Sequence, residues 1–390
     1  MERTTDAARA HETTGERHRP RVVLIGPMPP PYMGPSLATE ILLGSTLKKA
    51  FDLVHLDTSH HKTLKTLGRM NFQNILSALK HSLTLVITIL SKRPEIVYVP
   101  ISQTTIGYFK DSIYILIGKL LGRRIVCHLR GGHFRTWFDV ANFAVRAYVR
   151  FVHSFVDVQI VLGECLKPLF EGLVSEEAIF VVPNGRDFDF DRSQVHADTG
   201  GKPRILFLGN ILESKGALDL VRAVPILRSA GIEAEFVLAG SYENLRNRPE
   251  LDAHIEREGD EVVRLIGPVV GDEKFNLLKS ADIFVFPTYF PFEGHPWVIV
   301  EAMAAGLPIV TTDHAAIRES VVDGVNGLIV AKQNPQDIAD RIRELVASPS
   351  MRRRMGEASR HLYEQKFTEA KMVEAMSVAL HAAHRSSGRC

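Results

Sequence analysis

A regular alternation between short apolar runs and longer helical stretches constrains the fold of this chain more than any other feature. The first half contains six apolar runs of strand length, at residues 22–25, 53–56, 96–99, 125–129, 158–161 and 179–182. Helical stretches separate several of them, at residues 36–50, 106–121 and 140–155. Such an alternation predicts a parallel sheet with helices on both of its faces.

The alternation stops once and then begins again. Residues 183–203, PNGRDFDFDRSQVHADTGGKP, are rich in Asp and Gly with almost no aliphatic side chain, which is typical of a linker. Six more apolar runs follow, at residues 205–208, 236–238, 262–265, 283–286, 309–310 and 328–330, with helical stretches at 216–228, 272–280 and 298–305. From residue 335 the pattern is helical to the end, with a break near 348–349. Because 390 residues exceed one comfortable core, we predict two doubly wound α/β units with a ligand cleft between them.

Composition and charge exclude several classes of protein. The net charge of +2 gives no reason to expect a nucleic-acid partner. The three cysteines, Cys127, Cys165 and Cys390, form no Cys-x-x-Cys pair, which argues against a zinc or disulfide framework and favours a reducing compartment. No apolar run approaches the ~20 residues that span a bilayer, and residues 1–20 lack the apolar core of a signal peptide. We therefore expect a cytoplasmic protein.

Two loops in the first half have the composition of a ligand site. Residues 26–36, GPMPPPYMGPS, follow the first strand, and Gly34 would let a phosphate approach the backbone; a proline-stiffened loop explains them equally well. Residues 128–133, His-Leu-Arg-Gly-Gly-His, end a strand, where polar groups favour a site and glycines leave room for a ligand. Arg130 and His133 are candidates for binding hydroxyls or phosphate, whereas His128 alternates along the strand as a core residue would.

A third loop, GNILESKG at residues 209–216, carries Lys215 at the entrance to a helix. A helix N-terminus and an ammonium group together suit a diphosphate. Taken alone, the loop is better explained as a solvated helix start beside a Ser214 cap. Its position among the other candidate loops favours the diphosphate.

The densest group of special residues lies between residues 286 and 312. Glu293 stands on a proline-flanked loop, and Glu301 falls about one turn into the following helix. This spacing lets one helix start present two carboxylates and several free N–H groups to a single ligand. Carboxylates accept hydrogen bonds from vicinal sugar hydroxyls, and the N–H groups suit a phosphate. The alternative is that Glu301 only favours the helix N-terminus and that Gly306 and Pro308 only end the helix. The density of these residues favours a nucleotide-sugar site.

An aspartate run in the linker has the spacing of a hard-cation site. Asp187, Asp189 and Asp191 form Asp-x-Asp-x-Asp, but no glycine turn or distal bidentate Glu accompanies them. We interpret them as solvated linker charge and predict no metal site.

The motif EGHPWVIVEAMAAGLPIV at residues 293–310 resembles the retaining glycosyltransferases of family four, the glycogen-synthase-like group with the GT-B fold. Its pattern is Glu-x7-Glu followed by Ala-Met-Ala-x-Gly-x-Pro. Supporting pieces are VPNG at residues 182–185, GNILESKG at 209–216, DGVNGLIV at 323–330 and the early proline–glycine loop. The resemblance covers residues 21–367 and is strongest in the second half. It implies two Rossmann-like doubly wound domains that face a central cleft.

The resemblance also implies a role for each matching position. Glu301 would hold the ribose hydroxyls and Glu293 the hydroxyls of the donor sugar. Backbone near Gly294 and His295 would meet the sugar or the distal phosphate. Lys215 would neutralise the diphosphate, and Gly34 would let that diphosphate approach the N-terminal domain.

Two positions depart from the family pattern. Asn210, which by the resemblance would border the diphosphate, replaces an arginine that the family often has after the glycine, so Arg130 or Arg186 would supply the second cation. Arg130 itself stands where the family often has a histidine, and His128 or His133 can take that role. The catalytic set implied is therefore Glu293, Lys215, Arg130 and His133.

The implied reaction moves a hexose from a UDP- or GDP-linked sugar to an acceptor hydroxyl with retention and with no metal or cofactor. The expected acceptor is a glycan or lipid-linked glycan of surface polysaccharide or glycolipid assembly. A nucleotide-sugar epimerase, a sugar phosphorylase, or a sugar-nucleotide-binding protein without turnover are the alternatives.

The resemblance divides the chain into a disordered tail at residues 1–20, an acceptor-side domain at 21–190, a linker at 191–203 and a nucleotide-sugar-binding domain at 204–366. Residues 367–390 would form a helix that packs back on the N-terminal domain. The apolar segment at residues 62–93 carries Lys62, Lys65, Arg69, Lys80, Lys92 and Arg93, which is compatible with an interfacial amphipathic surface at the inner face of the cell membrane. Core helices with solvated lysines are the favoured alternative.

Overall fold

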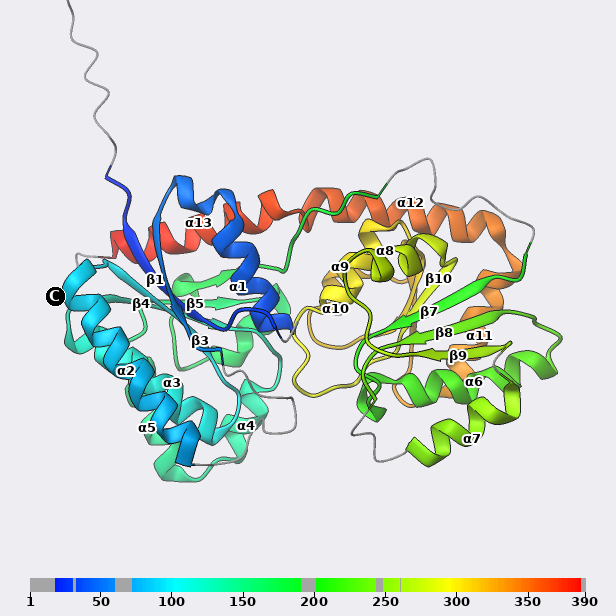
Figure 1. Ribbon diagram of the computed structural model, residues 1–390, viewed down its shortest axis with the longest axis horizontal. Coiled ribbons are helices and arrows are strands. Elements are labelled where there is room, and N and C mark those ends of the chain that lie inside the picture. The colour runs from blue at the N-terminus through cyan, green and yellow to red at the C-terminus, as the bar shows by residue number, and fades with distance from the viewer. Residues whose placement is uncertain are drawn as a thin grey trace, which may run out of the picture.

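The computed structural model describes residues 18–30, 33–59, 72–190, 201–242, 248–259 and 261–386. Most of the predicted tail and linker lies outside these ranges, as do Asp191, Cys390 and the basic residues Lys62, Lys65 and Arg69. Figure 1 shows two α/β halves side by side, joined by segments of the chain that cross from one half to the other.

The N-terminal half is built on a parallel six-stranded sheet in the order β2-β1-β3-β4-β5-β6. All six predicted runs are strands, and most of their side chains are buried because helices cover both faces. The strands are β1 (Arg21–Gly26), β2 (Asp52–Asp57), β3 (Ile96–Ile101), β4 (Arg124–Leu129), β5 (Val158–Val161) and β6 (Ile179–Val181). The helices are α1 (Gly34–Gly44), α2 (Phe72–Lys92), α3 (Thr105–Leu120), α4 (Phe134–Val140) and α5 (Phe143–His153).

The C-terminal half repeats this plan in a second parallel sheet, in the order β12-β11-β10-β7-β8-β9. Its strands are β7 (Arg204–Leu208), β8 (Glu235–Ala239), β9 (Val263–Ile266), β10 (Ile283–Phe286), β11 (Ile309–Thr312) and β12 (Gly327–Val330). Its helices are α6 (Ala217–Ser229), α7 (Arg248–Glu258), α8 (Gly271–Ser280), α9 (Trp297–Ala304), α10 (Ile317–Ser320) and α11 (Pro335–Ala347). The predicted class, two doubly wound α/β units, is confirmed.

The order of strands reverses between β7 and β10, since the chain moves outward through β8 and β9 and then returns to the other side of β7. Ligands of open α/β sheets bind beyond the carboxyl ends of the strands at such a reversal. The loops after β7 and β10 are the ones that carry Lys215 and Glu293.

Two long helices follow α11 and connect the halves. The predicted break at Ser348 is confirmed, and the Ser348 side chain caps α12 (Pro349–Lys366) by accepting from the Met351 amide. A second break separates α12 from α13 (Glu369–Arg385), close to residue 367, where the last helix was predicted to begin; Thr368 caps α13 through the Lys371 amide. Helix α13 packs on β3, β4, β5 and β6 of the N-terminal sheet, as Figure 1 shows.

The start of the predicted linker is packed rather than free. Phe188 and Phe190 alternate with exposed Asp187 and Asp189, and both rings lie in the core of the C-terminal half. Judged by packing, the crossover therefore comes before residue 188, earlier than the predicted boundary at 190. The Asp187 carboxylate is not merely solvated, because it accepts a 3.0 Å hydrogen bond from the Glu369 amide at the start of α13.

None of the helices within the described ranges combines the length and the apolar character that crossing a membrane requires.

The loops after β7 and β10 are tied to each other through backbone groups. The Tyr289 amide donates to the Ser214 carbonyl at 2.8 Å, and Thr288 Oγ1 donates to the same carbonyl at 3.3 Å. Gly216 has a left-handed backbone, with φ of +80°, and a Cβ there would lie 2.4 Å from the Pro287 carbonyl oxygen. Only glycine allows this approach, which fixes the residue that precedes it, Lys215.

The two ends of α6 offer a matched test of this approach. Gly231, just after α6, has a similar φ of +75°, but nothing lies within 4 Å of its missing Cβ. Gly231→Ala should therefore lower the free energy of unfolding by only the left-handed cost of about 1–2 kcal/mol. Gly216→Ala adds a backbone clash, so we expect a loss of about 3–5 kcal/mol. Urea denaturation of both variants checks this, and equal losses would contradict the packing described.

Candidate functional site

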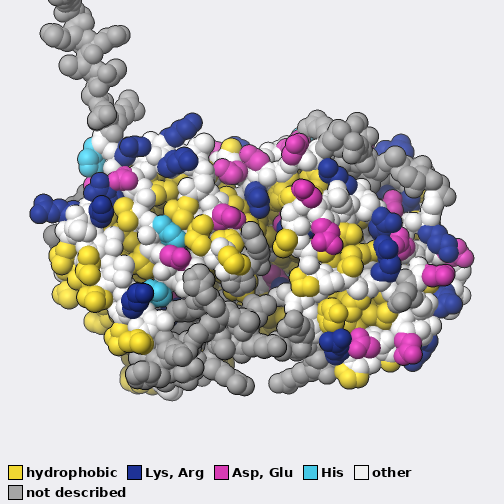
Figure 2. Space-filling model, viewed as in Figure 1, with side chains coloured by type: hydrophobic (Ala, Val, Ile, Leu, Met, Phe, Trp, Pro, Cys, Tyr) yellow, Lys and Arg dark blue, Asp and Glu magenta, His cyan; other side chains and the backbone are white. Residues whose placement is uncertain are grey.

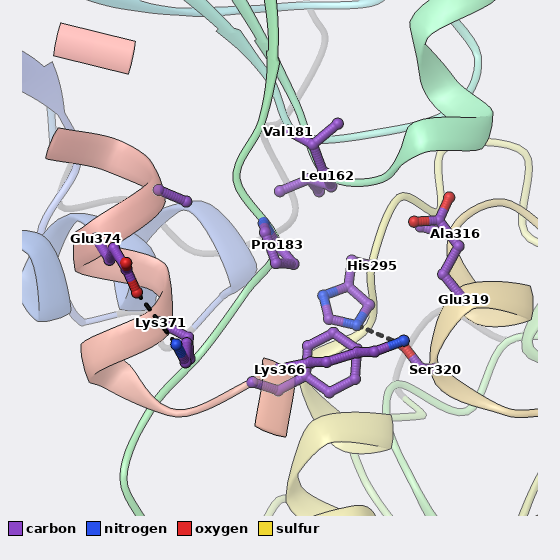
Figure 3. A pocket seen from close by; sticks show the side chains of 12 residues that line it. Leu162, Val181, Pro183, His295, Ala316, Glu319, Ser320, Lys366, Lys371 and Glu374 are labelled. Atoms are coloured by element: carbon purple, nitrogen blue, oxygen red, sulfur yellow. Dashed lines mark hydrogen bonds and ion pairs between the residues drawn. The ribbon is translucent and has the colours of Figure 1, made fainter. Parts of the chain in front are cut away.

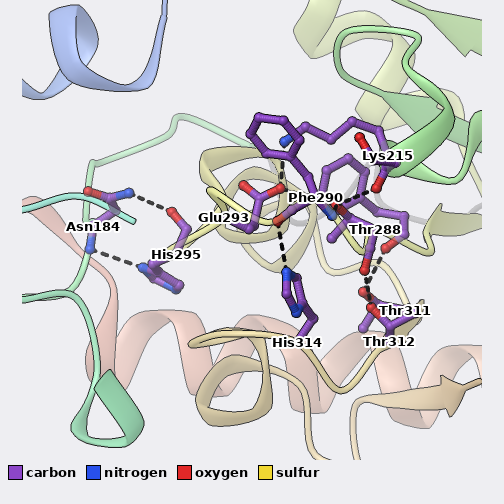
Figure 4. A network of polar contacts seen from close by, with 11 residues as sticks. Asn184, Lys215, Thr288, Phe290, Glu293, His295, Thr311, Thr312 and His314 are labelled. Carbon is purple, nitrogen blue, oxygen red and sulfur yellow. Dashed lines mark hydrogen bonds and ion pairs between the residues drawn. The ribbon is translucent and has the colours of Figure 1, made fainter. Parts of the chain in front are cut away.

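The carboxyl edge of the C-terminal sheet holds an ion pair between two residues that the sequence singled out. Lys215 Nζ lies 2.5 Å from Glu293 Oε2, and the two side chains are 14% and 10% exposed. Thr288 Oγ1 also lies 3.2 Å from Glu293 Oε2, so its one hydroxyl proton is shared between this carboxylate and the Ser214 carbonyl. The Lys215 ammonium lies 4.5 Å from the centre of the Phe290 ring. Figure 4 shows these groups around the loop after β10. The sequence predicted both charged residues at a ligand but not their pairing with each other.

Hydroxyl groups from the neighbouring strand hold this loop in place. Thr311 Oγ1 donates to the carbonyl at the end of β10 at 2.7 Å, and Thr312 Oγ1 donates to the Thr288 carbonyl. His314 Nε2 lies 2.8 Å from the Phe290 carbonyl oxygen (Figure 4). Sequence reasoning missed Thr288, Thr311, Thr312 and His314. The run Thr-Thr-Asp-His at the end of an apolar strand is the signal that could have found three of them.

His314 is held as a neutral imidazole of defined tautomer. Its Nδ1 lies 3.1 Å from Lys332 Nζ, and an ammonium can only donate, so Nδ1 is the acceptor. The proton therefore sits on Nε2, which donates to the Phe290 carbonyl. Burial lowers the pKa of His314 from its ordinary value. The ring thus supports the loop without adding charge beside Lys215.

Glu301 lies on α9 and is almost fully buried, at 1% exposure. Its Oε1 accepts from Lys274 Nζ at 2.6 Å, whereas Oε2 is buried and has no hydrogen-bond partner among the described residues. Burial raises the pKa of Glu301, and the charges of Lys274 and Arg186 oppose that rise. A buried carboxylate oxygen with no partner is costly, and a ligand hydroxyl would satisfy it. The two carboxylates of the motif are thus held by separate cations rather than by one shared group.

On the N-terminal side, Arg130 is already engaged. Its guanidinium donates to Tyr98 Oη at 3.1 Å and to Asn184 Oδ1 at 3.3 Å. His128 is buried behind it, with Nδ1 2.7 Å from the same Tyr98 oxygen, and burial holds its pKa well below the ordinary value. His128 is therefore a core residue, which was one of the two interpretations left open for it. The His133 ring lies at the cleft, edge-on to Phe292 at 4.8 Å between centroids.

The glycines beside Arg130 serve a purpose other than the predicted one. A Cβ on Gly131 would lie 2.7 Å from the Phe292 carbonyl oxygen, and one on Gly132 equally close to that of Glu293. In turn, a Cβ on Gly294 would lie 2.9 Å from the Arg130 carbonyl oxygen. From the sequence, we expected Gly131 and Gly132 to leave room for a ligand. In this domain arrangement the room is filled by the backbone of the opposite half.

His295 joins the halves through its side chain. The Asn184 amide donates to His295 Nδ1 at 3.0 Å, and Asn184 Nδ2 donates to the His295 carbonyl at 2.6 Å (Figure 4). Because Nδ1 accepts, Nε2 carries the proton and donates to Ser320 Oγ at 2.8 Å. Burial lowers the pKa of His295 to about 4, so the ring is neutral at neutral pH. Neither the ring nor the carbonyl points toward Lys215.

The remaining predicted positions lie at the same edge of the two sheets. Gly34 begins α1, and a Cβ there would lie 3.7 Å from the Trp297 side chain at the start of α9. Trp297 is 9% exposed and packs with the core of the N-terminal half. Asn210 follows β7 and is exposed.

A cavity of about 380 Å³ lies beside the crossover, away from Lys215 and Glu301. Pro183, His295 and Phe367 line it, and Glu319 stands at its wall (Figure 3). The Glu319 carboxylate accepts from the backbone amides of Glu164 and Cys165, at 3.0 and 2.8 Å, and so clasps the N-terminal half. No predicted donor-binding residue except His295 lines this cavity.

Across the residues that the structure describes, no group of three or more His, Cys, Asp or Glu side chains is arranged to hold a metal ion.

Comparison with known sequences identifies relatives over part of the chain. Residues 202–348 match the family model for group 1 glycosyl transferases. CapM of Staphylococcus aureus, a capsular polysaccharide biosynthesis glycosyltransferase, is 31% identical over 162 residues, which cover 42% of this chain and 41% of that protein. The D-inositol 3-phosphate glycosyltransferase of Arthrobacter sp. (strain FB24) is 32% identical over 186 residues, covering 47% and 43%. The chain thus spans less than half the length of these curated relatives.

Solved structures share both halves of the fold. Sucrose-phosphate synthase from Thermosynechococcus elongatus matches with a TM-score of 0.70 at 17% identity, over 94% of this chain and 100% of that chain. Anabaena HepE, solved in complex with UDP-glucose, matches with a TM-score of 0.70 at 16% identity, over 93% and 100%. At these identities the likeness shows the fold alone. The comparisons thus show a group 1 glycosyl transferase region at residues 202–348 and, for the chain as a whole, the two-domain GT-B fold.

Proposed function

We propose that the chain is a retaining glycosyltransferase that moves a hexose from a nucleoside-diphosphate sugar to an acceptor hydroxyl. The observation that carries the proposal is the Lys215–Glu293 pair at the β7/β10 reversal, where a doubly wound sheet binds its ligand. The pair lies within residues 202–348, the part of the chain that matches the glycosyltransferase family.

On binding, the donor would replace the present partners of Lys215 and Glu293, which are paired with each other in the free protein. The diphosphate would take the Lys215 ammonium, and the hydroxyls of the sugar would take the Glu293 carboxylate. The ribose would reach the unpartnered Oε2 of Glu301, after the side chains that now cover this atom move aside. Gly34, Asn210, and the backbone at Gly294 and His295 would border the diphosphate and the sugar. The complex of HepE with UDP-glucose supports a UDP-linked donor, with GDP as the other candidate.

In the proposed reaction the acceptor oxygen bonds to the anomeric carbon on the face from which the diphosphate leaves. The bond between the anomeric carbon and the phosphate oxygen breaks, and that oxygen takes the proton of the acceptor hydroxyl. Negative charge therefore grows on the diphosphate, where preorganised positive groups lower the barrier. Lys215 and the N-terminus of α6 directly after it suit this task. Arg130 would add a second cation by releasing Tyr98, and His133 would border the acceptor.

We further propose that no divalent metal takes part and that the acceptor is a glycan or lipid-linked glycan at the inner face of the cell membrane. The name of CapM, a capsular polysaccharide enzyme, and that of the WaaB galactosyltransferase of the lipopolysaccharide outer core support a surface glycan. Release of nucleoside diphosphate that requires an acceptor, with retention at the anomeric carbon and resistance to EDTA, is the test. Epimerised donor without release would instead identify an epimerase, and donor binding without either product a binding protein.

Two buried glutamates provide a matched test of the ribose contact. Glu301 pairs with Lys274 at 2.6 Å, and Glu258 pairs with Arg228 at 2.7 Å on the outer side of the same half. In a thermal-shift series with UDP, GDP and ADP sugars, one donor should raise the Tm of the wild type. Glu301→Gln should weaken that donor at least ~10-fold, since a charged acceptor is worth about 1.5–3 kcal/mol. Glu258→Gln should lower Tm without changing the donor affinity; equal effects on affinity would reject the assignment of Glu301.

The two ends of β7 provide a test of the diphosphate cation. Lys215 follows the carboxyl end, whereas Arg204 begins the strand at the opposite edge and pairs with Glu235 at 2.9 Å. Lys215→Met should lower kcat by about 10²–10³-fold, the loss typical of removing one preorganised group. Arg204→Met should leave kcat within a few-fold of the wild type. Turnover that survives Lys215→Met would place the charge stabilisation elsewhere.

A further inference from the structure

Helix α2 exposes a continuous row of aliphatic side chains on its outer face. Residues Leu76, Leu79, Leu83, Ile87 and Leu90 are between 56% and 62% exposed. Their spacing of three and four residues places them on one side of the helix. Leu85 and Ile89 on the inner face are fully buried. An ordinary surface helix has a polar outer face, so the alternative of a core helix with solvated lysines does not describe α2.

Neighbouring helices extend this surface. Helix α2 packs against α3, and α3 packs against α5, as Figure 1 also shows. Helix α3 exposes Ile106, Phe109 and Ile113, and α5 exposes Phe143 and Phe151. Figure 2 shows hydrophobic side chains gathered along this edge of the N-terminal half. Apolar groups that gather on one surface, rather than lying singly, mark a contact with another body.

The charges on these helices are almost all positive. Helices α2, α3 and α5 carry six basic side chains, Lys80, Lys92, Lys110, Lys119, Arg146 and Arg150. Their single acidic residue is Asp111, which is 4% exposed, accepts from the Ser102 amide and hydroxyl, and pairs with Lys110 at 3.2 Å. Lys119 pairs with Asp157 at 3.4 Å, which leaves Lys80, Lys92, Arg146 and Arg150 as the basic side chains without an ion-pair partner among the described residues. The whole chain is nearly balanced, with 47 basic and 45 acidic residues, so this excess is local. An apolar row with a basic surround complements an anionic lipid surface.

The surface begins at the edge of the sheet that holds the cleft. Helix α3 starts four residues after β3 ends, and in a parallel sheet this is the carboxyl edge. The loop after β4 leaves the same edge and touches the opposite half at Phe292 and Glu293. If α2 and α3 rested on a membrane, a molecule anchored in that membrane would therefore have its head group near the boundary between the two halves.

We propose that α2, α3 and α5 form a docking face for an anionic lipid bilayer, which presents a lipid-anchored acceptor to the cleft. The role of the docked state rests on the proposed function, whereas lipid binding itself does not. The face binds by inserting the aliphatic row of α2 into the head-group region, and the basic side chains select anionic lipid.

Co-sedimentation of the full chain with vesicles tests the proposal. We expect binding to vesicles of phosphatidylcholine and phosphatidylglycerol, weaker binding in 0.5 M NaCl, and little binding to phosphatidylcholine alone. Leu83→Gln with Ile87→Gln should reduce the bound fraction at least ~10-fold, because both side chains are exposed and enter the bilayer. The matched control is Val270→Gln with Val378→Gln, two valines 57% and 55% exposed on other surfaces, which should bind like the wild type. Since all four positions are exposed, each variant should keep the wild-type Tm.

Three results would overturn the proposal. The first is absence of binding to anionic vesicles, and the second is equal loss in the α2 and control variants. The third is a dimer in solution that only the α2 variant dissociates, which would assign the face to a second copy of the chain. A thermal-shift measurement with UDP-glucose on the same samples tests the proposed function separately from the docking face. Vesicle binding without any donor binding would reject the proposed function and keep the docking face. Donor binding without vesicle binding would keep the proposed function and reject the docking face.

Discussion

The contact between Asn184 and His295 is the constraint on which the arrangement of the two halves depends. It joins the first crossing of the chain to the loop that carries Glu293, and it requires a neutral imidazole whose Nδ1 accepts the Asn184 amide. Around it, backbone meets backbone at Gly131 and Gly294, where a side chain would separate the halves. Packing thus fixes the geometry of the site, because these contacts decide how far Arg130 lies from the loops that carry Lys215 and Glu293.

The predicted charged side chains of the site, Lys215, Glu293, Glu301 and Arg130, already have partners, although the Oε2 atom of Glu301 has none among the described residues. Lys215 holds Glu293, Lys274 holds Glu301, and Arg130 holds Tyr98. Buried charges that lack partners cost several kcal/mol, so this pairing stabilises the site. A ligand that carries both anionic groups and hydroxyls can replace an anion and a cation together, whereas a ligand with only one kind of group leaves a charge unpaired. Such a site favours ligands that carry both.

The strands were predictable because helices bury both faces of each sheet, which leaves uninterrupted apolar runs such as Ile283–Phe286. Lys215 and Glu293 were predictable because charged residues beside glycine and proline stand out after such runs. The ion-pair partners of the site carboxylates were not predictable. Lys274, for example, lies 27 residues from Glu301 and has no local signal in the sequence. The break at Phe367 has no signal in the helical pattern itself, and only the family resemblance placed a helix boundary there. The burial of Phe188 was missed because alternate Asp residues made its segment look like free linker.

The chain passes between the halves twice, near residues 183–187 and again near 366–369, and the two passages are bonded to each other. The Arg186 amide donates to the Phe367 carbonyl, and the Tyr363 hydroxyl donates to the Arg186 carbonyl at 2.9 Å. Two backbone segments bonded side by side resist both sliding and twisting. The motion of the two halves that meets least resistance is therefore a rotation about the line that runs through both passages. A rotation about this line would separate the loops that carry Gly131 and Gly294. The hydrogen bonds between the two passages, and the strand register of both sheets, would be kept.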